Sequence, residues 1–397
     1  MEAYIVEWLS LLVRWLHLIA GIAWIGASFY FIMLDNSLAL PAKAEDAKRG
    51  VSGELWAVHG GGLYQSQKFL AGPKGEALSN NLHWSKYEAY TTWLSGMGLL
   101  AIIYWFGAST YLIDKSVMAL TPVQAIGISI ASIAGGWVVY HALCKFVGNN
   151  EKLLAALLFA FVVILDWGLF QVFSARAAFL HVGAVLGTIM AANVFFAIIP
   201  GQKKMVAEIR AGREPDPASG RVGKQRSIHN TYFTLPVLFI MISNHHPMTY
   251  SHPYGWLILV AIMAAGALIR QFFVLRHRGQ TRSLFVVMAV LLLLAVFIVL
   301  APKPSSATAA GSVTFAQVKT VINARCITCH AAQPTFAGTI QPPKGVMLEG
   351  TEQIIAHAQK INETVASRYM PIANLTQMTD GEREIIALWF RDGAKVR

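Results

Sequence analysis

The chain alternates between long apolar runs and short polar connections. Seven runs are long enough to cross a bilayer core of about 30 Å. An eighth is shorter and contains Pro236, so it crosses only if its flanks extend it through a kink. Backbone groups in lipid must bond within their own segment, which predicts helices. The runs are residues 8–33, 89–112, 124–147, 153–174, 179–199, 232–243, 255–275 and 283–301.

The chain changes character after the last run. Residues 301–310 read APKPSSATAA, a composition typical of an unfolded linker. A small soluble domain is expected from about Ser312. The predicted fold is all-α: a polytopic bundle of about eight spans over residues 1–301, a linker at 302–311, and a small helical domain at 312–397.

Composition supports this division. Hydrophobic residues make up 55% of the chain and charged residues only 13%, which excludes a water-soluble globule, and three cysteines are too few for a disulfide scaffold. The formal net charge is +11, but the tail from 302 onward holds ten basic and seven acidic residues. Nucleic acid is therefore not an expected partner.

The basic residues predict the orientation in the membrane. Eighteen Lys and Arg residues lie in one set of alternate connections and only Lys115 and Arg176 in the other. Positive charge marks the cytoplasmic side, so the N-terminus and the tail are expected outside the cytoplasm of a bacterial inner membrane. The basic connections are residues 34–88, 145–152, 200–231 and 276–282.

The tail carries the most specific motif, Cys326-Ile-Thr-Cys329-His330. This spacing is typical of covalently attached haem c, in which two thiols bind the haem and the adjacent imidazole binds iron. A zinc site would require a second Cys or His pair, and the tail adds only His357. The tail is therefore predicted to be a small class I-like cytochrome c domain, in keeping with a location outside the cytoplasm.

A methionine is the usual sixth ligand when a haem only carries electrons. Met370, in Arg-Tyr-Met-Pro, is the preferred candidate, with core packing as its alternative role. Met347 follows the motif too closely for the chain to wrap a porphyrin. Met378 directly precedes a predicted helix whose capping box is Thr379 and Glu382.

Histidines within the apolar runs are candidate ligands of one or two haem b groups. His17 lies roughly 15 Å below the outer surface by the helical rise, and His181 enters from the same side, so the two could clamp one haem. His141 and His229 could hold a second haem nearer the cytoplasm. The alternatives are histidines that bond neighbouring backbone or lie at the interface.

The long connection at 34–88 holds a second set of chemical groups, His59, His83, Lys86 and Glu88, beside glycines and tryptophans. Imidazole, ammonium and indole together can hold a flat anionic heterocycle by charge, hydrogen bonds and stacking. The alternative is a hairpin on the membrane surface, with aromatic rings at the interface and lysines among the headgroups.

Three strings in the membrane part and the CITCH tail resemble the membrane-bound bacterial urate oxidases that carry a fused cytochrome c. The first run, WLHLIAGIAWIG, is also similar to the haem-binding helix of membrane-type bacterial protoporphyrinogen oxidases and copper-resistance D proteins, which implies a haem ligand at His17. The three strings are VHGGGLY at 58–64, LHWSKYEAYTTWLSG at 82–96 and HNTYFTLPVLFIMISNHHP at 229–247.

The resemblance implies oxidation of urate to 5-hydroxyisourate, with oxygen from water. Electrons would pass to haem c, then to a soluble cytochrome c or a terminal oxidase, without hydrogen peroxide as product. On that basis His59, His83, Lys86 and Glu88 are hypothesised to line the urate site, with a His or Glu taking the proton. Two alternatives stay open: a quinol or other small-molecule dehydrogenase, and a transporter or haem carrier.

Overall fold

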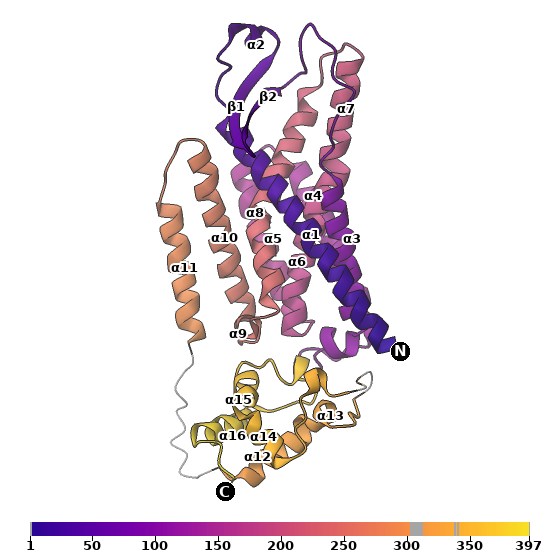
Figure 1. Cartoon of the computed structure of the whole chain (residues 1–397), viewed down its shortest axis with the longest axis vertical. Coiled ribbons are helices and arrows are strands. Elements are labelled where there is room, and N and C mark those ends of the chain that lie inside the picture. The colour runs from indigo at the N-terminus through magenta and orange to yellow at the C-terminus, as the bar shows by residue number, and fades with distance from the viewer. Residues whose placement is uncertain (1, 302–312, 337–338, 340, 397) are drawn as a thin grey trace.

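The computed structural model describes residues 2–301, 313–336, 339 and 341–396. It consists of a long helical bundle with a small helical domain at one end (Figure 1). The N-terminus lies at the end of the bundle that faces this domain. The predicted linker at 302–311 lies outside the described residues.

The bundle elements follow the predicted order. All eight apolar runs are helical, although residues 89–112 form an α-helix followed by two π-helical segments and the run at 232–243 is the second half of a longer helix. The elements are α1 (Glu2–Ser37), α2 (Ala44–Lys48), α3 (Tyr87–Leu99), η1 (Leu100–Trp105), η2 (Ala108–Leu112), α4 (Pro122–Val147), α5 (Glu151–Phe170), α6 (Ala175–Ala192), η3 (Asn193–Ile198), α7 (Ile199–Arg210), α8 (Pro217–Ser243), α9 (Pro247–Tyr250), α10 (Gly255–His277) and α11 (Leu284–Leu300).

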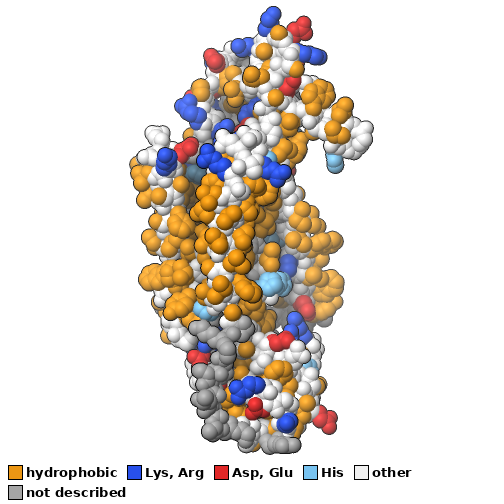
Figure 2. All heavy atoms as spheres, turned by 90° about the vertical axis from the view of Figure 1, so that its left-hand side faces the viewer, with side chains coloured by type: hydrophobic (Ala, Val, Ile, Leu, Met, Phe, Trp, Pro, Cys, Tyr) orange, Lys and Arg blue, Asp and Glu red, His pale blue; other side chains and the backbone are white. Residues whose placement is uncertain are grey.

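Among the described residues, five helices are long and apolar enough to cross a membrane: Tyr4–Ser37, Pro122–Val147, Glu151–Phe170, Ala175–Arg210 and Gly255–His277. α11 is apolar but only 17 residues long, and α8 contains Pro236 and a polar first half. Apolar side chains cover the middle of the bundle, while charged side chains gather at its far end and on the small domain (Figure 2).

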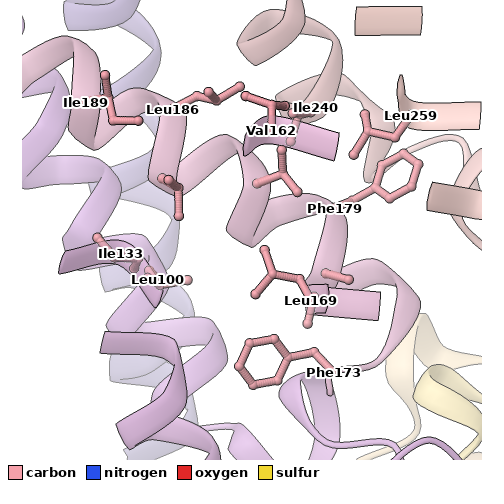
Figure 3. Close-up of a cluster of buried hydrophobic side chains, with 14 of the residues drawn as sticks. Leu100, Ile133, Val162, Leu169, Phe173, Phe179, Leu186, Ile189, Ile240 and Leu259 are labelled. Atoms are coloured by element: carbon pink, nitrogen blue, oxygen red, sulfur yellow. The ribbon is translucent and has the colours of Figure 1, made fainter. Parts of the chain in front are cut away.

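α6 forms the centre of the bundle, between α4, α5 and α8. Its side chains pack with those of α5, α8 and α10 in the buried cluster of Figure 3. Two glycines allow the close approach of helices. A Cβ at Gly183 would lie 2.6 Å from Ile240 Cγ2 of α8, and one at Gly136 of α4 would lie 2.4 Å from Val185 Cγ1.

The connection at 34–88 departs from the all-α prediction. Strands β1 (Val51–His59) and β2 (Gly62–Phe69) pair antiparallel as a hairpin, closed by His59 opposite Gly62. The two turn residues, Gly60 and Gly61, have φ of 58° and 80°, a conformation that glycine adopts without strain. This connection therefore contains a hairpin, as its alternative interpretation expected, and the glycines form a tight turn.

The small domain consists of α12 (Phe315–Arg325), α13 (Ile327–His330), η4 (Pro343–Gly345), α14 (Thr351–Ala356), α15 (Ala358–Ala366), η5 (Ile372–Asn374) and α16 (Asp380–Arg391). α12 packs against α16, with the rings of Phe315 and Trp389 6.0 Å apart. The predicted capping box of Thr379 and Glu382 is confirmed at the start of α16. η5 contacts η2, so the domain touches the bundle directly.

Candidate functional site

The Cys-Ile-Thr-Cys-His motif forms a single helical turn. The amides of Cys329 and His330 both donate to the carbonyl of Cys326, at 3.1 and 2.9 Å, so the two cysteines and the histidine lie within one helical turn. Both cysteines are free. A hydrogen bond of 2.9 Å joins His330 Nδ1 to the carbonyl of Val346. With the proton on Nδ1, Nε2 is left able to bind a metal, which is the usual arrangement of a histidine ligand.

Burial keeps the two thiols neutral. It raises the pKa of Cys326 to about 12, with a contribution from neighbouring Cys329, and it also raises the pKa of Cys329. Within the described ranges, no three His, Cys, Asp or Glu side chains gather in a way that could hold a metal ion. The donor set fits two thioether attachments and one imidazole ligand.

The three methionines of the tail have different surroundings. Met378 is 3% exposed and belongs to the domain core, whereas Met347 and Met370 are partly exposed. Met370 lies between α15 and η5, and its amide donates to the carbonyl of Thr364 at 3.0 Å. The assignment of Met370 as iron ligand stays a prediction.

A buried arginine fixes the segment that carries Met370. Arg383 Nη1 donates to the carbonyls of Met370 and Val365, both at 2.8 Å, and Nη2 donates to Asn374 Oδ1 at 3.2 Å. Three points of this segment are thus tied to α16. No sequence pattern indicates this role, because an arginine within a surface helix pattern predicts a solvated side chain.

His17 and His181 have partners on different helices. His17 Nδ1 bonds to the carbonyl of Thr92 at 2.9 Å and to Ser95 Oγ at 3.1 Å, both on α3. His181 is fully buried, with Nδ1 bonded to the carbonyl of Ala177 at 2.8 Å and Nε2 to Ser129 Oγ of α4 at 2.7 Å. Binding of iron by His181 would require it to give up one of these bonds.

His141 and His229 also face different groups. His141 is exposed on α4, with its ring 5.2 Å from that of Trp137. His229 Nδ1 instead bonds to Tyr140 Oη at 2.7 Å and lies 3.8 Å from Cys144 Sγ. Haem b at either pair therefore stays a prediction.

His229 belongs to a buried polar cluster that sequence analysis missed. Asn193 Nδ2 donates to Tyr140 Oη and to Asn230 Oδ1, both at 2.9 Å. The guanidinium of Arg226 lies 4.9 Å from the centre of the Tyr140 ring and is 4% exposed. Three separate segments, α4, η3 and α8, supply this cluster, so no local motif reveals it.

The four residues hypothesised to line the urate site lie at the end of the bundle away from the tail domain. His59 is exposed at the end of the hairpin and His83 is exposed before α3. Lys86 Nζ lies 4.8 Å from the centre of the Tyr87 ring, and the carbonyl of Glu88 accepts from Thr92 Oγ1. A nearby open groove of about 510 Å³ is lined by Trp84 and by α7 side chains that include Lys203 and Arg210. The four residues do not line that groove, and their role stays a prediction.

Comparison with known proteins adds one finding. Residues 3–301, three quarters of the chain, match the model of the family described as urate oxidase N-terminal. No curated protein matches the chain, and no solved structure does. The match covers the helical bundle and ends before the Cys-Ile-Thr-Cys-His motif. The chain belongs to the urate oxidase N-terminal family, which indicates an oxidoreductase function related to urate.

Proposed function

We propose that this protein is a membrane-bound urate oxidase that passes electrons from urate to a haem c held by its own C-terminal domain. One observation carries the proposal. The segment matched by the urate oxidase family ends at residue 301, and a separate helical domain then carries Cys326, Cys329 and His330 in an arrangement that fits covalent haem. The family match indicates urate as the substrate, and the Cys-Ile-Thr-Cys-His motif indicates haem c as the electron acceptor.

The proposed reaction converts urate and water into 5-hydroxyisourate, two protons and two electrons. Haem c, when bound, supplies a one-electron acceptor, so each urate requires two transfers. Cys326 and Cys329 would attach the haem, and His330 and Met370 would bind its iron. Val346, through its carbonyl, would keep the His330 ring in the tautomer and orientation that coordination requires.

We also propose that the N-terminus and the haem domain face the outside of a bacterial inner membrane. The asymmetry of Lys and Arg between alternate connections supports this orientation, as does the position of the N-terminus beside the tail domain in Figure 1. Electrons would leave to a soluble cytochrome c or a terminal oxidase on that side.

Anaerobic mixing of the purified full-length protein with urate tests the proposal. The protein should come from cells competent for cytochrome c maturation. Urate absorbance should fall while the reduced haem c band rises, with two haems reduced for each urate consumed when protein is in excess. The Cys326→Ala, Cys329→Ala double variant is the control for the acceptor.

Two results would contradict the proposal. If urate absorbance stays constant when the protein carries its haem, urate is not the substrate. If urate is consumed while haem c stays oxidised, electrons do not pass from urate to the haem of the same protein. Haem reduction by quinol but not by urate would favour the quinol dehydrogenase alternative.

A further inference from the structure

A cavity lies at the junction of the bundle and the tail domain. Its volume is about 180 Å³, and both parts of the molecule line it. η5 of the tail contacts η2 of the bundle at this junction. Its polar lining includes Asp114, Arg176 and Tyr250 from the bundle and Arg368, Asn374 and Arg383 from the tail.

The charged groups of the lining are mainly cationic. Arg176 donates through Nε to the neutral amide oxygen of Asn244 at 2.9 Å, and Arg383 bonds only to carbonyl and amide oxygens. Arg368 is paired with Asp380 at 2.5 Å. Asp114 is the acidic residue of the lining, and its Oδ1 already accepts from Ser116. Arg176 and Arg383 therefore belong to the lining without a carboxylate partner in the described part of the chain, and the Arg176 guanidinium also lies 5.7 Å from the centre of the Tyr111 ring.

Two buried donors in the lining also lack acceptors. Arg383 Nε and Tyr250 Oη have no hydrogen-bond partner among the described residues, although these residues are only 9% and 4% exposed. Burial raises the pKa of Tyr250, which keeps its phenol a neutral donor. A buried donor left without an acceptor costs about 1–3 kcal/mol. The mainly cationic lining indicates a ligand that brings negative charge and acceptor oxygens.

We propose that this cavity binds the urate anion, an assignment that rests on the proposed function. Urate is a flat anion with several carbonyl oxygens, so it offers the negative charge and the acceptors that the cationic lining favours. The cavity is smaller than the roughly 300–1,000 Å³ of sites for drug-sized ligands, as expected for a compact two-ring compound.

The position of the cavity fits electron transfer. Arg368 and Asn374 belong to the segment that contains Met370, the predicted iron ligand. A substrate in the cavity would lie beside that segment, at the end of the bundle that faces the tail domain. The hypothesised site of His83 and Lys86 lies at the opposite end, so the two placements are mutually exclusive.

Equilibrium dialysis of urate against reduced full-length protein tests the assignment, because a fully reduced haem cannot turn urate over. Arg176→Gln should weaken binding more than tenfold through loss of a charged donor, and Tyr250→Phe about three- to tenfold through loss of one neutral donor. Tyr254→Phe is the matched control. It removes the same atom from an exposed ring outside the cavity lining and should bind urate like the unmodified protein.

The outcomes separate this assignment from the proposed function. If the unmodified protein neither binds nor oxidises urate, the proposed function fails. If it binds and oxidises urate but Arg176→Gln and Tyr250→Phe bind as tightly, only the cavity assignment is overturned. The same holds if these variants shift the haem potential without changing urate affinity, because the cavity would then serve a haem carboxylate. Loss of urate binding in His83→Ala, with unchanged binding in the cavity variants, would move the site to the opposite face.

Discussion

The tail domain and the membrane bundle organise their polar chemistry in opposite ways. In the tail, Cys326, Cys329 and His330 lie on one helical turn, and the His330 ring is oriented by a carbonyl 16 positions away. In the bundle, Tyr140 bonds to a histidine 89 positions away and Asn193 to an asparagine 37 positions away. A site built within one turn can be read from sequence, whereas a site assembled from three helices exists only once they pack.

The two regions also differ in how their polar groups are satisfied. In the tail, Arg383 donates to three oxygen atoms on the segment that it holds, and among its nitrogens Nε alone has no partner in the described part of the chain. In the bundle, Asp166 is fully buried and both its carboxylate oxygens lack partners among the described residues, as do Nε and Nη1 of Arg226. Buried polar groups without partners are costly, so the buried polar groups of the bundle are less completely satisfied than those of the tail.

The sharpest test of the local site removes its two thiols. The Cys326→Ala, Cys329→Ala variant should carry no covalent haem, because no thioether can form, and urate-dependent haem reduction should vanish completely. Denaturing gel electrophoresis followed by haem staining measures the attachment.

Cys144→Ala is the matched control from the bundle. Cys144 lies beside His229 rather than in the motif, so this variant should stain like the unmodified protein. Equal staining of all three proteins would mean that haem is not attached through the tail motif.

A second test concerns the two methionines that the structure distinguishes. Met370→Ala should lower the haem midpoint potential by on the order of 0.1 V, because a thioether ligand stabilises reduced iron and axial ligands set potentials over a range of about 0.8 V. Potentiometric titration of the full-length protein measures the change.

Met378→Ala should behave differently, since Met378 fills the domain core. It should destabilise the domain by about 2–5 kcal/mol and leave the potential of the folded protein unchanged. The ligand assignment is wrong if the potential responds to Met378 and not to Met370.

Sequence patterns predicted the parts of this molecule that depend on neighbouring residues. All eight apolar runs are helical, and the Thr379 capping box begins α16 as expected. The hairpin was expected only as the alternative interpretation of this connection, because HGGGL also has the composition of a loop, and only pairing of β1 with β2 makes Gly60 and Gly61 a turn. The junction cavity was beyond reach for the same reason, since Tyr250 and Arg383 are 133 positions apart and meet only across two domains.

The dispersed cluster of the bundle can be tested through its central amide. Asn193→Ala should destabilise the protein by about 1–3 kcal/mol, because Tyr140 and Asn230 each lose a buried partner. The Asn193→Ala, Asn230→Ala double variant should be non-additive by about 0.5–3 kcal/mol. Thermal unfolding in detergent measures both effects.

Asn36→Ala provides the comparison for this test. Asn36 Oδ1 also accepts a hydrogen bond, from Arg278, but the contact is exposed. Its loss should change stability by no more than about 0.5 kcal/mol. If Asn36→Ala and Asn193→Ala change the stability equally, the buried polar cluster adds no stability beyond that of a single exposed hydrogen bond.

The smallest effect on stability is expected at Glu382, a carboxylate near the surface of the tail domain. Burial alone would raise the pKa of this carboxylate, but hydrogen bonds from Thr379 and the guanidinium of Arg325 lower it below its usual value. The ionised form therefore stabilises the folded tail domain above the unfolded pKa of about 4.3, and this contribution is lost as the pH falls through the lower folded pKa.

The Glu382→Gln variant should lose less than about 1 kcal/mol of stability at pH 7, and its stability should depend less on pH on the acid side. Glu384→Gln, two residues along α16 and exposed, should keep the original slope between about pH 5 and pH 3 when haem absorbance follows the unfolding. If the stability of both variants depends on pH with the same slope, the capping box acts without the charge of Glu382. The tail domain would then be no more sensitive to acid at Glu382 than at any other surface carboxylate.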